Sequence, residues 1–364
     1  MLAVITFILV LSVLVSFHEF GHFSVARLCG VEVKVFSIGF GPKLWSKKWG
    51  ATEYCICAVP LGGYVQMLGD DPTEEIVEAD KARSFLTQSL SKKVAIVVAG
   101  PLFNFILAFF VFWGIFMAGI PMIAPEVGEV QDASPAMLGG IKPGDRVISI
   151  NDKKIEHWEE LREIVQEGNG SPVRFLVSRT GKEIPLTIVP MKKETKNIFG
   201  EDQGVWIIGV MPGKTQFTKQ YNPISAFALG MEKTWEMIAL NTVGIVKLIQ
   251  GKISSDNIGG PLLIGKMAGE QAAQGLMNVL LFTAMISINL GVINLFPVPV
   301  LDGGHLLFFL IEAVIGKPLS LKAREMANQV GLALLVSLMV FAFYNDFMRF
   351  DVMGFFARLF SRQG

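Results

Sequence analysis

Residues 18–22 read His-Glu-Phe-Gly-His, which places two histidines four positions apart with a glutamate directly after the first. Positions i and i+4 of a helix lie on the same face, so the imidazoles of His18 and His22 could bind one Zn²⁺ ion. Glu19 would then lie beside the metal's water as a general base. Because only three of the five positions are specified, the pattern also fits a pair of histidines on an ordinary soluble helix.

The surroundings of these three side chains favour the metal site. They interrupt an apolar run over residues 2–28, which is long enough to cross a bilayer as a helix. An ionisable side chain inside a membrane costs about 2.5 to 3.5 kcal/mol on insertion scales and is tolerated mainly where it lines a cavity or has a function. A divalent cation would supply that function, because it pairs with neutral imidazoles and favours a nearby carboxylate.

A catalytic zinc site needs a third protein ligand and one open position for water. The longer pattern that adds a downstream histidine is absent, since Val25 and Leu28 stand where that pattern has glycine and histidine. Asp302, directly after a later apolar segment, is a candidate ligand, although a turn or helix N-cap aspartate would look the same. His305 from the same turn is a competing candidate of lower rank. His157, in a polar region, is expected to be an ordinary surface histidine.

The composition indicates a membrane protein. Of 364 residues, 51% are hydrophobic and only 18% are charged, with a mean hydropathy of +0.49. Lysine plus arginine (32) equals aspartate plus glutamate (32), so no net charge indicates nucleic acid or an acidic partner. The three cysteines, Cys29, Cys55 and Cys57, lack the spacing of a disulfide framework and are expected to be buried or reduced thiols.

Four segments are apolar and long enough to predict membrane-spanning helices: residues 2–28, 94–120, 276–301 and 330–344. The first has no basic region before it and no small-residue cleavage site after it, so we expect an uncleaved membrane helix. A further apolar pattern at helical spacing, over residues 223–250, could lie on the membrane surface. The expected fold class is an α-helical polytopic membrane protein.

The basic residues predict the orientation of these helices. The connections over 30–92 and 302–329 are rich in lysine and arginine, which places both on the cytoplasmic side by the positive-inside rule. Both termini and the long segment 122–275 are then expected outside. Long segments translocate whatever their charge, so the basic residues in 122–275 are compatible with this orientation.

Four regions are expected along the chain. They are an N-terminal membrane part over 1–121, a small folded domain over 122–205, a linker with the surface helix over 206–275, and a C-terminal membrane part over 276–364. In the first region, residues 30–66 alternate β-formers with glycines, which is typical of a hairpin or small sheet, and the acidic residues 70–80 are expected to form a solvated linker.

The second region shows the alternation of an α+β domain. Strands are expected over 128–131, 146–152, 173–179 and 184–190, and an amphipathic helix over 157–168. A domain of this size can fold alone with a modest core.

Together the motifs resemble the site-2 protease family of intramembrane metalloproteases. They are HEFGH in the first helix, GFG at 39–41, PLGGYVQM at 60–67, GPLFNF at 100–105, NLFPVPVLDGGH at 294–305 and FAFYNDF at 341–347. The match covers nearly the whole chain in order. It implies that His18, His22 and Asp302 bind Zn²⁺ and that Glu19 is the catalytic base.

The same resemblance implies roles for residues around the active centre. Asn294 and Pro297 correspond to a motif thought to help bind substrate. Residues 30–66, with Gly39 and Gly41, resemble a membrane-entering β-loop whose exposed strand edge could hold an unwound substrate. From the residues alone, these glycines would equally fit plain hairpin turns.

Residues 134–155 are similar to part of a PDZ domain, in which small residues and GIKPGD form the turn before a core strand. Another small β-rich module is the alternative. PDZ grooves bind extended segments by strand addition. The best-known family pattern has two such domains in tandem, whereas this sequence has one clear copy and only VWIIGVMPG at 205–213 after it.

The resemblance implies an enzyme of the bacterial cytoplasmic membrane that hydrolyses peptide bonds within the transmembrane segment of a single-span protein whose outer domain has already been trimmed. An anti-sigma factor of envelope-stress signalling and leftover signal peptides are the substrates it suggests. A transporter or channel could also use a His-Glu-His cluster, but no internal repeat is visible. The protein could also be a catalytically inactive scaffold that binds partners through its PDZ-like domain, but such a scaffold would need neither Glu19 nor Asp302.

Overall fold

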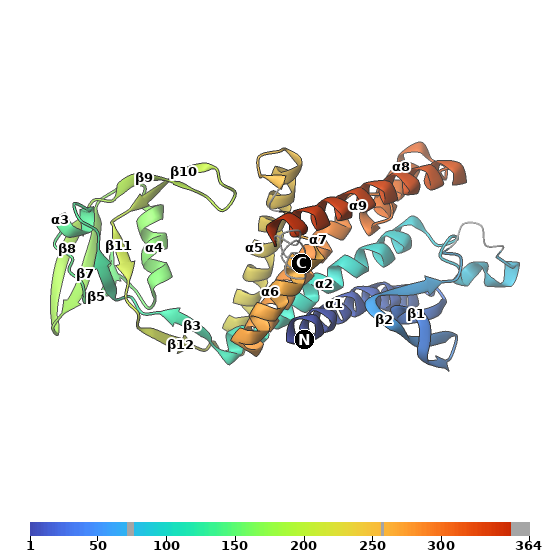
Figure 1. The fold of residues 1–364 in the computed structure, drawn as a ribbon, viewed down its shortest axis with the longest axis horizontal. Helices are drawn as coiled ribbons and strands as arrows, with labels where there is room; N and C mark the ends of the chain where they lie inside the picture. Colours follow the sequence, from blue (N-terminus) through green and yellow to red (C-terminus); the bar gives the residue numbers. More distant parts are fainter. Residues whose placement is uncertain (71–75, 256–257, 351–364) are drawn as a thin grey trace, which may run out of the picture. The chain divides into compact units, whose positions relative to one another are not determined.

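A computed structural model describes residues 1–70, 76–255 and 258–350. The chain divides into two compact units, one formed by Met1–Trp113 with the chain from Phe227 onward and the other by Gly114–Ala226. In Figure 1 the first unit holds most of the long helices, and the second holds most of the short strands.

The first unit contains the helices that could cross a membrane. α1 (Leu2–Leu28), α2 (Leu90–Ala118), α7 (Leu276–Leu295) and α9 (Leu321–Arg349) are each long and apolar enough to do so, and each corresponds to one of the four predicted segments. A helix satisfies its own backbone hydrogen bonds, which lipid cannot do.

The bounds of three helices differ from those predicted. α2 begins and ends a few residues before the predicted 94–120. α7 ends at Leu295 rather than near residue 301, because Pro297 and Pro299 have no N–H with which to continue the helix. α9 extends beyond 330–344 on both sides. Its polar first turn is capped by Ser320, whose hydroxyl oxygen accepts a hydrogen bond from the Ala323 N–H.

Three more helices belong to the helical part of the chain: α5 (Pro223–Ile249), α6 (Pro261–Gln274) and α8 (Asp302–Ile315). α6 and α8 were not predicted as separate helices. α5 is not among the candidate spans of the described chain, and its position on the membrane surface stays a prediction.

α6 is fixed to the helices around it from two sides. Its residue Ala268 is buried in a cluster with Val10 and Leu14 of α1 and with side chains of α2 and α7. Its N-terminus is anchored to α9, because the carboxylate of Asp346 accepts hydrogen bonds from the backbone N–H groups of Gly260, Leu262 and Leu263 at 3.0–3.1 Å. A carboxylate at a helix N-terminus satisfies donors that have no partner within the helix.

β1 (Val33–Trp49) and β2 (Thr52–Met67) form the antiparallel hairpin that was predicted within residues 30–66. The hairpin folds back on itself, since each residue of 35–38 has one partner among residues 53–56 and another among residues 63–66. Gly39 and Gly41 have φ of +90° and +86°, which allows β1 to bend directly after this stretch.

The predicted acidic linker over 70–80 falls partly on residues 71–75, which lie outside the described residues. Its end, Glu78–Arg83, forms a short 3-10 helix. A buried cluster then joins the hairpin to the helices that carry the candidate site, with Phe23 of α1, Val33 and Met67 of the hairpin, Ile96 of α2 and Phe309 of α8.

The second unit has an antiparallel four-stranded sheet in the order β6-β5-β7-β8, in which β6 is the two-residue strand Lys153–Lys154. The predicted strands and helix are confirmed as β4 (Val127–Val130), β5 (Arg146–Ile150), β7 (Val173–Arg179), β8 (Lys182–Ile188) and α4 (Trp158–Glu167). Alternate residues of β7, among them Phe175, share a buried core with Val147 and Ile150 of β5 and with Leu161 of α4.

Several short elements of this unit were not predicted. They are β3 (Ile120–Ile123), α3 (Pro135–Leu138), β6 (Lys153–Lys154), β9 (Met191–Lys196), β10 (Asp202–Ile207), β11 (Val210–Pro212) and β12 (Gln216–Lys219). β9 pairs with β10, β11 with β4, and β12 with β3. The unit therefore extends from Gly114 to Ala226 and is longer than the predicted 122–205.

Candidate metal centre

Three side chains from distant parts of the chain converge in the first unit. His18 and His22 lie on one face of α1, and Asp302 is the first residue of α8. The Nε2 atoms of His18 and His22 are 3.2 Å apart, and they lie 3.2 Å from Asp302 Oδ2 and 3.5 Å from Asp302 Oδ1, respectively. Within the described ranges, this is the one group of three histidine, cysteine or acidic side chains that could hold a metal ion.

These separations suit a zinc ion. Ligands at about 2.0–2.1 Å in a tetrahedron lie about 3.3–3.4 Å from one another, close to the distances between the two nitrogens and the carboxylate. Asp302 Oδ2 is buried and receives no hydrogen bond from the part of the chain that is described, which is unfavourable for a carboxylate. A divalent cation would remove that cost, so the two imidazoles and the carboxylate fit Zn²⁺.

The turn between α7 and α8 brings the carboxylate to α1. The Leu301 N–H donates to the Val298 oxygen at 3.1 Å, and α8 begins at the next residue, Asp302. Val300 has φ of +83°, a conformation that a β-branched residue rarely adopts. Backbone of this kind persists where the surrounding structure holds it, and it is found most often at functional sites.

Glu19 and Asn294 line the same cavity of about 290 Å³ as the three ligands. Tyr64, Val65 and Met67 from the end of β2 also line it, and the Val65 backbone N–H donates a hydrogen bond to Glu19. The resemblance placed the segment 30–66 near the substrate, but it singled out Gly39 and Gly41 and not these β2 residues. The alternation of a strand shows which residues share a face, but not which other element that face or edge will meet.

The other predicted site residues do not all line this cavity. His305 lines the cavity but does not belong to the group of three ligands. Pro297 lies in the turn after α7, and Gly39 and Gly41 lie at the bend of β1; none of these three residues lines the cavity.

His157 is not part of the ligand group, as expected, but it is less exposed than an ordinary surface histidine. The residue is the N-cap of α4 in the second unit, and only 14% of its side chain is exposed. Its ring lies 3.4 Å from a carboxylate oxygen of Glu159 and 3.5 Å from one of Glu160. The first turn of α4 therefore covers it, far along the chain from the ligand group.

Two residues of α2 contact the outer nitrogens of the imidazoles. The backbone oxygen of Ile96 lies 2.9 Å from His22 Nδ1, and the side-chain nitrogen of Asn104 lies 3.1 Å from His18 Nδ1. Such outer partners orient metal-binding histidines. Sequence reasoning assigned them no role, although Asn104 lies in the motif GPLFNF.

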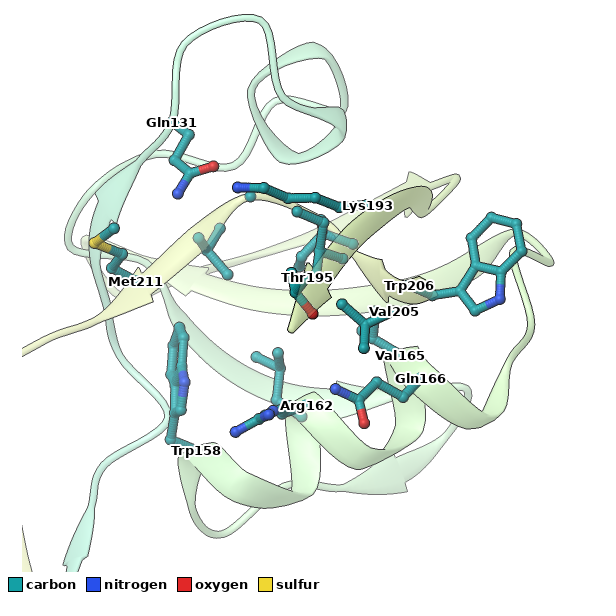
Figure 2. A pocket seen from close by; sticks show the side chains of 15 residues that line it. Gln131, Trp158, Arg162, Val165, Gln166, Lys193, Thr195, Val205, Trp206 and Met211 are labelled. Atoms are coloured by element: carbon teal, nitrogen blue, oxygen red, sulfur yellow. The ribbon is translucent and has the colours of Figure 1, made fainter. Parts of the chain in front are cut away.

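The second unit has a cavity of its own, of about 460 Å³, between α4 and strands β9 to β11 (Figure 2). Trp158 and Arg162 of α4 form one wall, and Lys193 and Thr195 of β9 lie across from them. Arg162 and Lys193 are the cationic side chains of the lining, which contains no carboxylate from the described residues.

Comparison with known proteins agrees with the geometry. The chain matches Peptidase family M50 over residues 6–338. It is 39% identical over 358 residues to a protein of Agrobacterium fabrum named as a zinc metalloprotease, with 94% of this chain and 95% of that protein covered.

A second relative is named for a role in regulation. The chain is 32% identical over 447 residues to the regulator of sigma-E protease RseP of Escherichia coli, with 94% of this chain and 98% of that protein covered. That alignment is longer than the 364 residues of this chain, so the relative has residues without a counterpart here. Since the family match and both relatives extend over most of its length, the chain belongs to peptidase family M50, the site-2 proteases, and is a zinc metallopeptidase.

Proposed function

We propose that this peptidase hydrolyses peptide bonds inside the membrane, within the transmembrane segment of a single-span protein. The observation that carries the proposal is the convergence of His18, His22 and Asp302 beside Glu19 in one cavity. The helix that carries three of these four residues is long and apolar enough to cross a bilayer. A substrate that reaches this cavity must therefore itself enter the membrane.

The residues divide the chemistry between them. His18, His22 and Asp302 would hold Zn²⁺, which when bound would supply a Lewis acid for the scissile carbonyl and bring the pKa of water close to neutrality. The carboxylate of Glu19 accepts a proton from the attacking water and then donates it to the nitrogen of the leaving amine. The hydrogen bond from the Val65 N–H holds the Glu19 side chain in the cavity.

A transmembrane substrate must be unwound locally before attack, because a helix uses its carbonyl oxygens in its own hydrogen bonds. The end of β2 offers a place for the extended form, since Tyr64, Val65 and Met67 line the active-site cavity. Asn294 offers an amide in the same cavity. We assign substrate binding to this strand edge, shaped by Gly39 and Gly41, and to the segment from Asn294 to Pro297.

The second unit is proposed to be a PDZ-like domain that filters substrates. β11 pairs with β4, and its residues Val210 and Met211 line the cavity. Met211 lies across the cavity from α4 (Figure 2). An extended peptide could add to β11 as a further strand. Arg162 and Lys193 favour a peptide that carries negative charge. Such a domain would admit substrates whose bulky outer domain has already been removed.

The proposed biological setting follows the relatives named as regulators of sigma-E protease. We propose an anti-sigma factor as a substrate, with leftover signal peptides as a second class. The enzyme is placed in the bacterial cytoplasmic membrane, with both termini and the PDZ-like domain outside and the active site near the cytoplasmic side. The basic connections of the chain support this orientation.

The decisive experiment tests Glu19. The full chain is produced with a single-span substrate that lacks its outer domain, and cleavage is followed for wild type and Glu19→Gln. We expect the variant to lose at least about 10²-fold in rate, because the general base is removed, while it still binds zinc. Glu270→Gln, which changes an exposed carboxylate on α6, should cleave as wild type does.

Equal cleavage by wild type and Glu19→Gln would contradict the protease mechanism. The ligand set is tested separately by zinc analysis of His18→Ala and Asp302→Ala. Each variant is expected to lose zinc, and full zinc occupancy in the Asp302 variant would remove this residue from the ligands.

A further inference from the structure

The motif GPLFNF of α2 packs against both imidazoles of the metal centre, yet the proposed reaction assigns it no step. A Cβ at Gly100 would overlap the ring of His22 and would approach His18 Cε1 to 2.9 Å. Asn104 lies one turn later on the same face of α2, is completely buried, and contacts His18. The motif is therefore in position to determine how the two rings are held.

The two rings need the same protonation pattern. A neutral imidazole binds a metal through the nitrogen that carries no proton, so the other nitrogen carries one. Both Nε2 atoms face Asp302, and the proton must then be on Nδ1. His22 meets this condition through Ile96, whose backbone oxygen lies 2.9 Å from Nδ1 and can only accept a hydrogen bond.

His18 faces a partner with two possible roles. The side-chain amide of Asn104 can offer either its NH₂ group or its oxygen, and a half-turn about the Cβ–Cγ bond exchanges them at almost unchanged shape. With Nδ2 3.1 Å from His18 Nδ1, Asn104 Oδ1 is buried without a hydrogen bond among the described residues. Only with the oxygen facing the ring can Asn104 accept the Nδ1–H that leaves Nε2 free to bind a metal.

We propose that Asn104 is a positioning residue, which accepts the Nδ1–H of His18 through Oδ1 and so holds His18 in the metal-binding tautomer. This inference rests on the zinc site of the proposed function. It gives the motif GPLFNF a role: Gly100 makes room for the rings, Ile96 one turn earlier orients His22, and Asn104 orients His18.

The position of Asn104 is itself fixed by the neighbouring helix. The hydroxyl of Ser287 on α7 donates to the backbone oxygen of Asn104 at 2.8 Å. Because Asn104 is completely buried, solvent does not compete for the ring nitrogen. Ser287→Ala is thus a matched control, since it removes a hydrogen bond to the same residue but leaves the amide and its contact with His18 in place.

The test measures zinc affinity of the purified full chain in detergent, by competition with a chromophoric chelator. Asn104→Leu keeps the size of the side chain but has no acceptor, and we expect it to weaken zinc binding about 10- to 100-fold. The ionised carboxylate of Asn104→Asp can only accept, and this variant should bind zinc within about threefold of wild type. The absorption spectrum of the cobalt-loaded chain should change in the Leu variant and return in the Asp variant.

Wild-type zinc affinity in Asn104→Leu would overturn the proposal. The proposal would also be overturned if Asn104→Asp bound zinc as weakly as Asn104→Leu. The same holds if Ser287→Ala bound zinc as weakly as either variant, because altered packing would then explain the loss of affinity. A failure of the zinc site itself gives a different result: the wild type would bind no zinc, or His18→Ala would keep it. The role of Asn104 and the proposed function can therefore fail separately.

Discussion

Glycines set how closely the helices of the metal centre approach one another. A Cβ on Gly21 of α1 would meet the backbone of Ala99 on α2, and a Cβ on Gly100 would overlap the imidazole of His22. Because neither Cβ is present, α1 and α2 can approach until the rings lie against the backbone of α2. Interfaces between membrane helices commonly use small residues in this way.

Gly100→Ala should therefore disrupt the metal centre. The added methyl group displaces His22, and we expect zinc affinity to fall by more than about tenfold, with a cost of about 1–3 kcal/mol in stability from overpacking. Gly114→Ala is the matched control on the same helix, because a Cβ there meets no atom within 4 Å. Chelator competition and thermal unfolding measure both effects. If Gly100→Ala bound zinc as tightly as wild type, the predicted overlap between the added methyl group and the His22 ring would be contradicted.

At the scale of elements, one partly buried ion pair joins a turn to the sheet of the second unit. Arg179 of β7 donates to both carboxylate oxygens of Asp145 at 2.7 Å, and the Lys142 N–H donates to the same carboxylate at 2.9 Å. Burial raises the pKa of Asp145, but the hydrogen bonds from Arg179 and Lys142 outweigh it and hold the pKa below its usual range. Folding therefore favours the charged form of Asp145.

This pair predicts a pH dependence for the second unit. A group whose pKa is lower in the folded state contributes stability above its unfolded pKa of about 3.9, and that contribution is lost as the pH falls through the folded value. Asp145→Asn should cost about 2 kcal/mol near pH 7, as expected for hydrogen bonds to a charged group. The difference from wild type should shrink below about pH 4.

Hydrogen exchange of β5 and β7 peptides in the full chain, with wild type and variant compared at each pH, measures this difference. Asp152→Asn is the control, because the pair Asp152–Arg174 is exposed, with 85% and 69% of the two side chains accessible. An exposed pair contributes little, so this variant should exchange like wild type. A cost for Asp145→Asn that stayed constant down to pH 3 would contradict the predicted titration.

At the scale of the molecule, the orientation of the chain decides where substrate, filter and active site meet. The basic residues predict that the connection 302–329 is cytoplasmic and that the segment 122–275 is outside. The proposed filter and the proposed entry of a trimmed substrate both require the second unit to lie outside.

Single cysteines test this orientation. Thr180→Cys and Lys317→Cys change exposed positions of the second unit and of the connection before α9, in a chain whose native cysteines are replaced by serine. A membrane-impermeant maleimide added to right-side-out vesicles should label position 180 at once and position 317 only after the membrane is opened. Labelling of position 317 in sealed vesicles would reverse the orientation and with it the proposed filter.

Local sequence patterns were sufficient for much of this protein. A run of apolar residues of membrane length predicts a spanning helix, because the bilayer sets that length, and each of the four predicted segments forms a helix long and apolar enough to cross a membrane. The spacing of His18 and His22 places both rings on one helix face, because 3.6 residues make a turn. Period-two alternation likewise predicted β5, β7 and β8 of the second unit.

The rest depended on contacts between residues far apart in the chain. Asp302 and an ordinary N-cap aspartate look alike in sequence, and only the turn after α7 brings its carboxylate within 3.2–3.5 Å of the two histidines. The burial of Asn104 against His18 and the approach of β2 to Glu19 likewise follow from how helices and sheet pack. Local periodicity fixes which face a residue occupies, whereas only packing decides what that face meets.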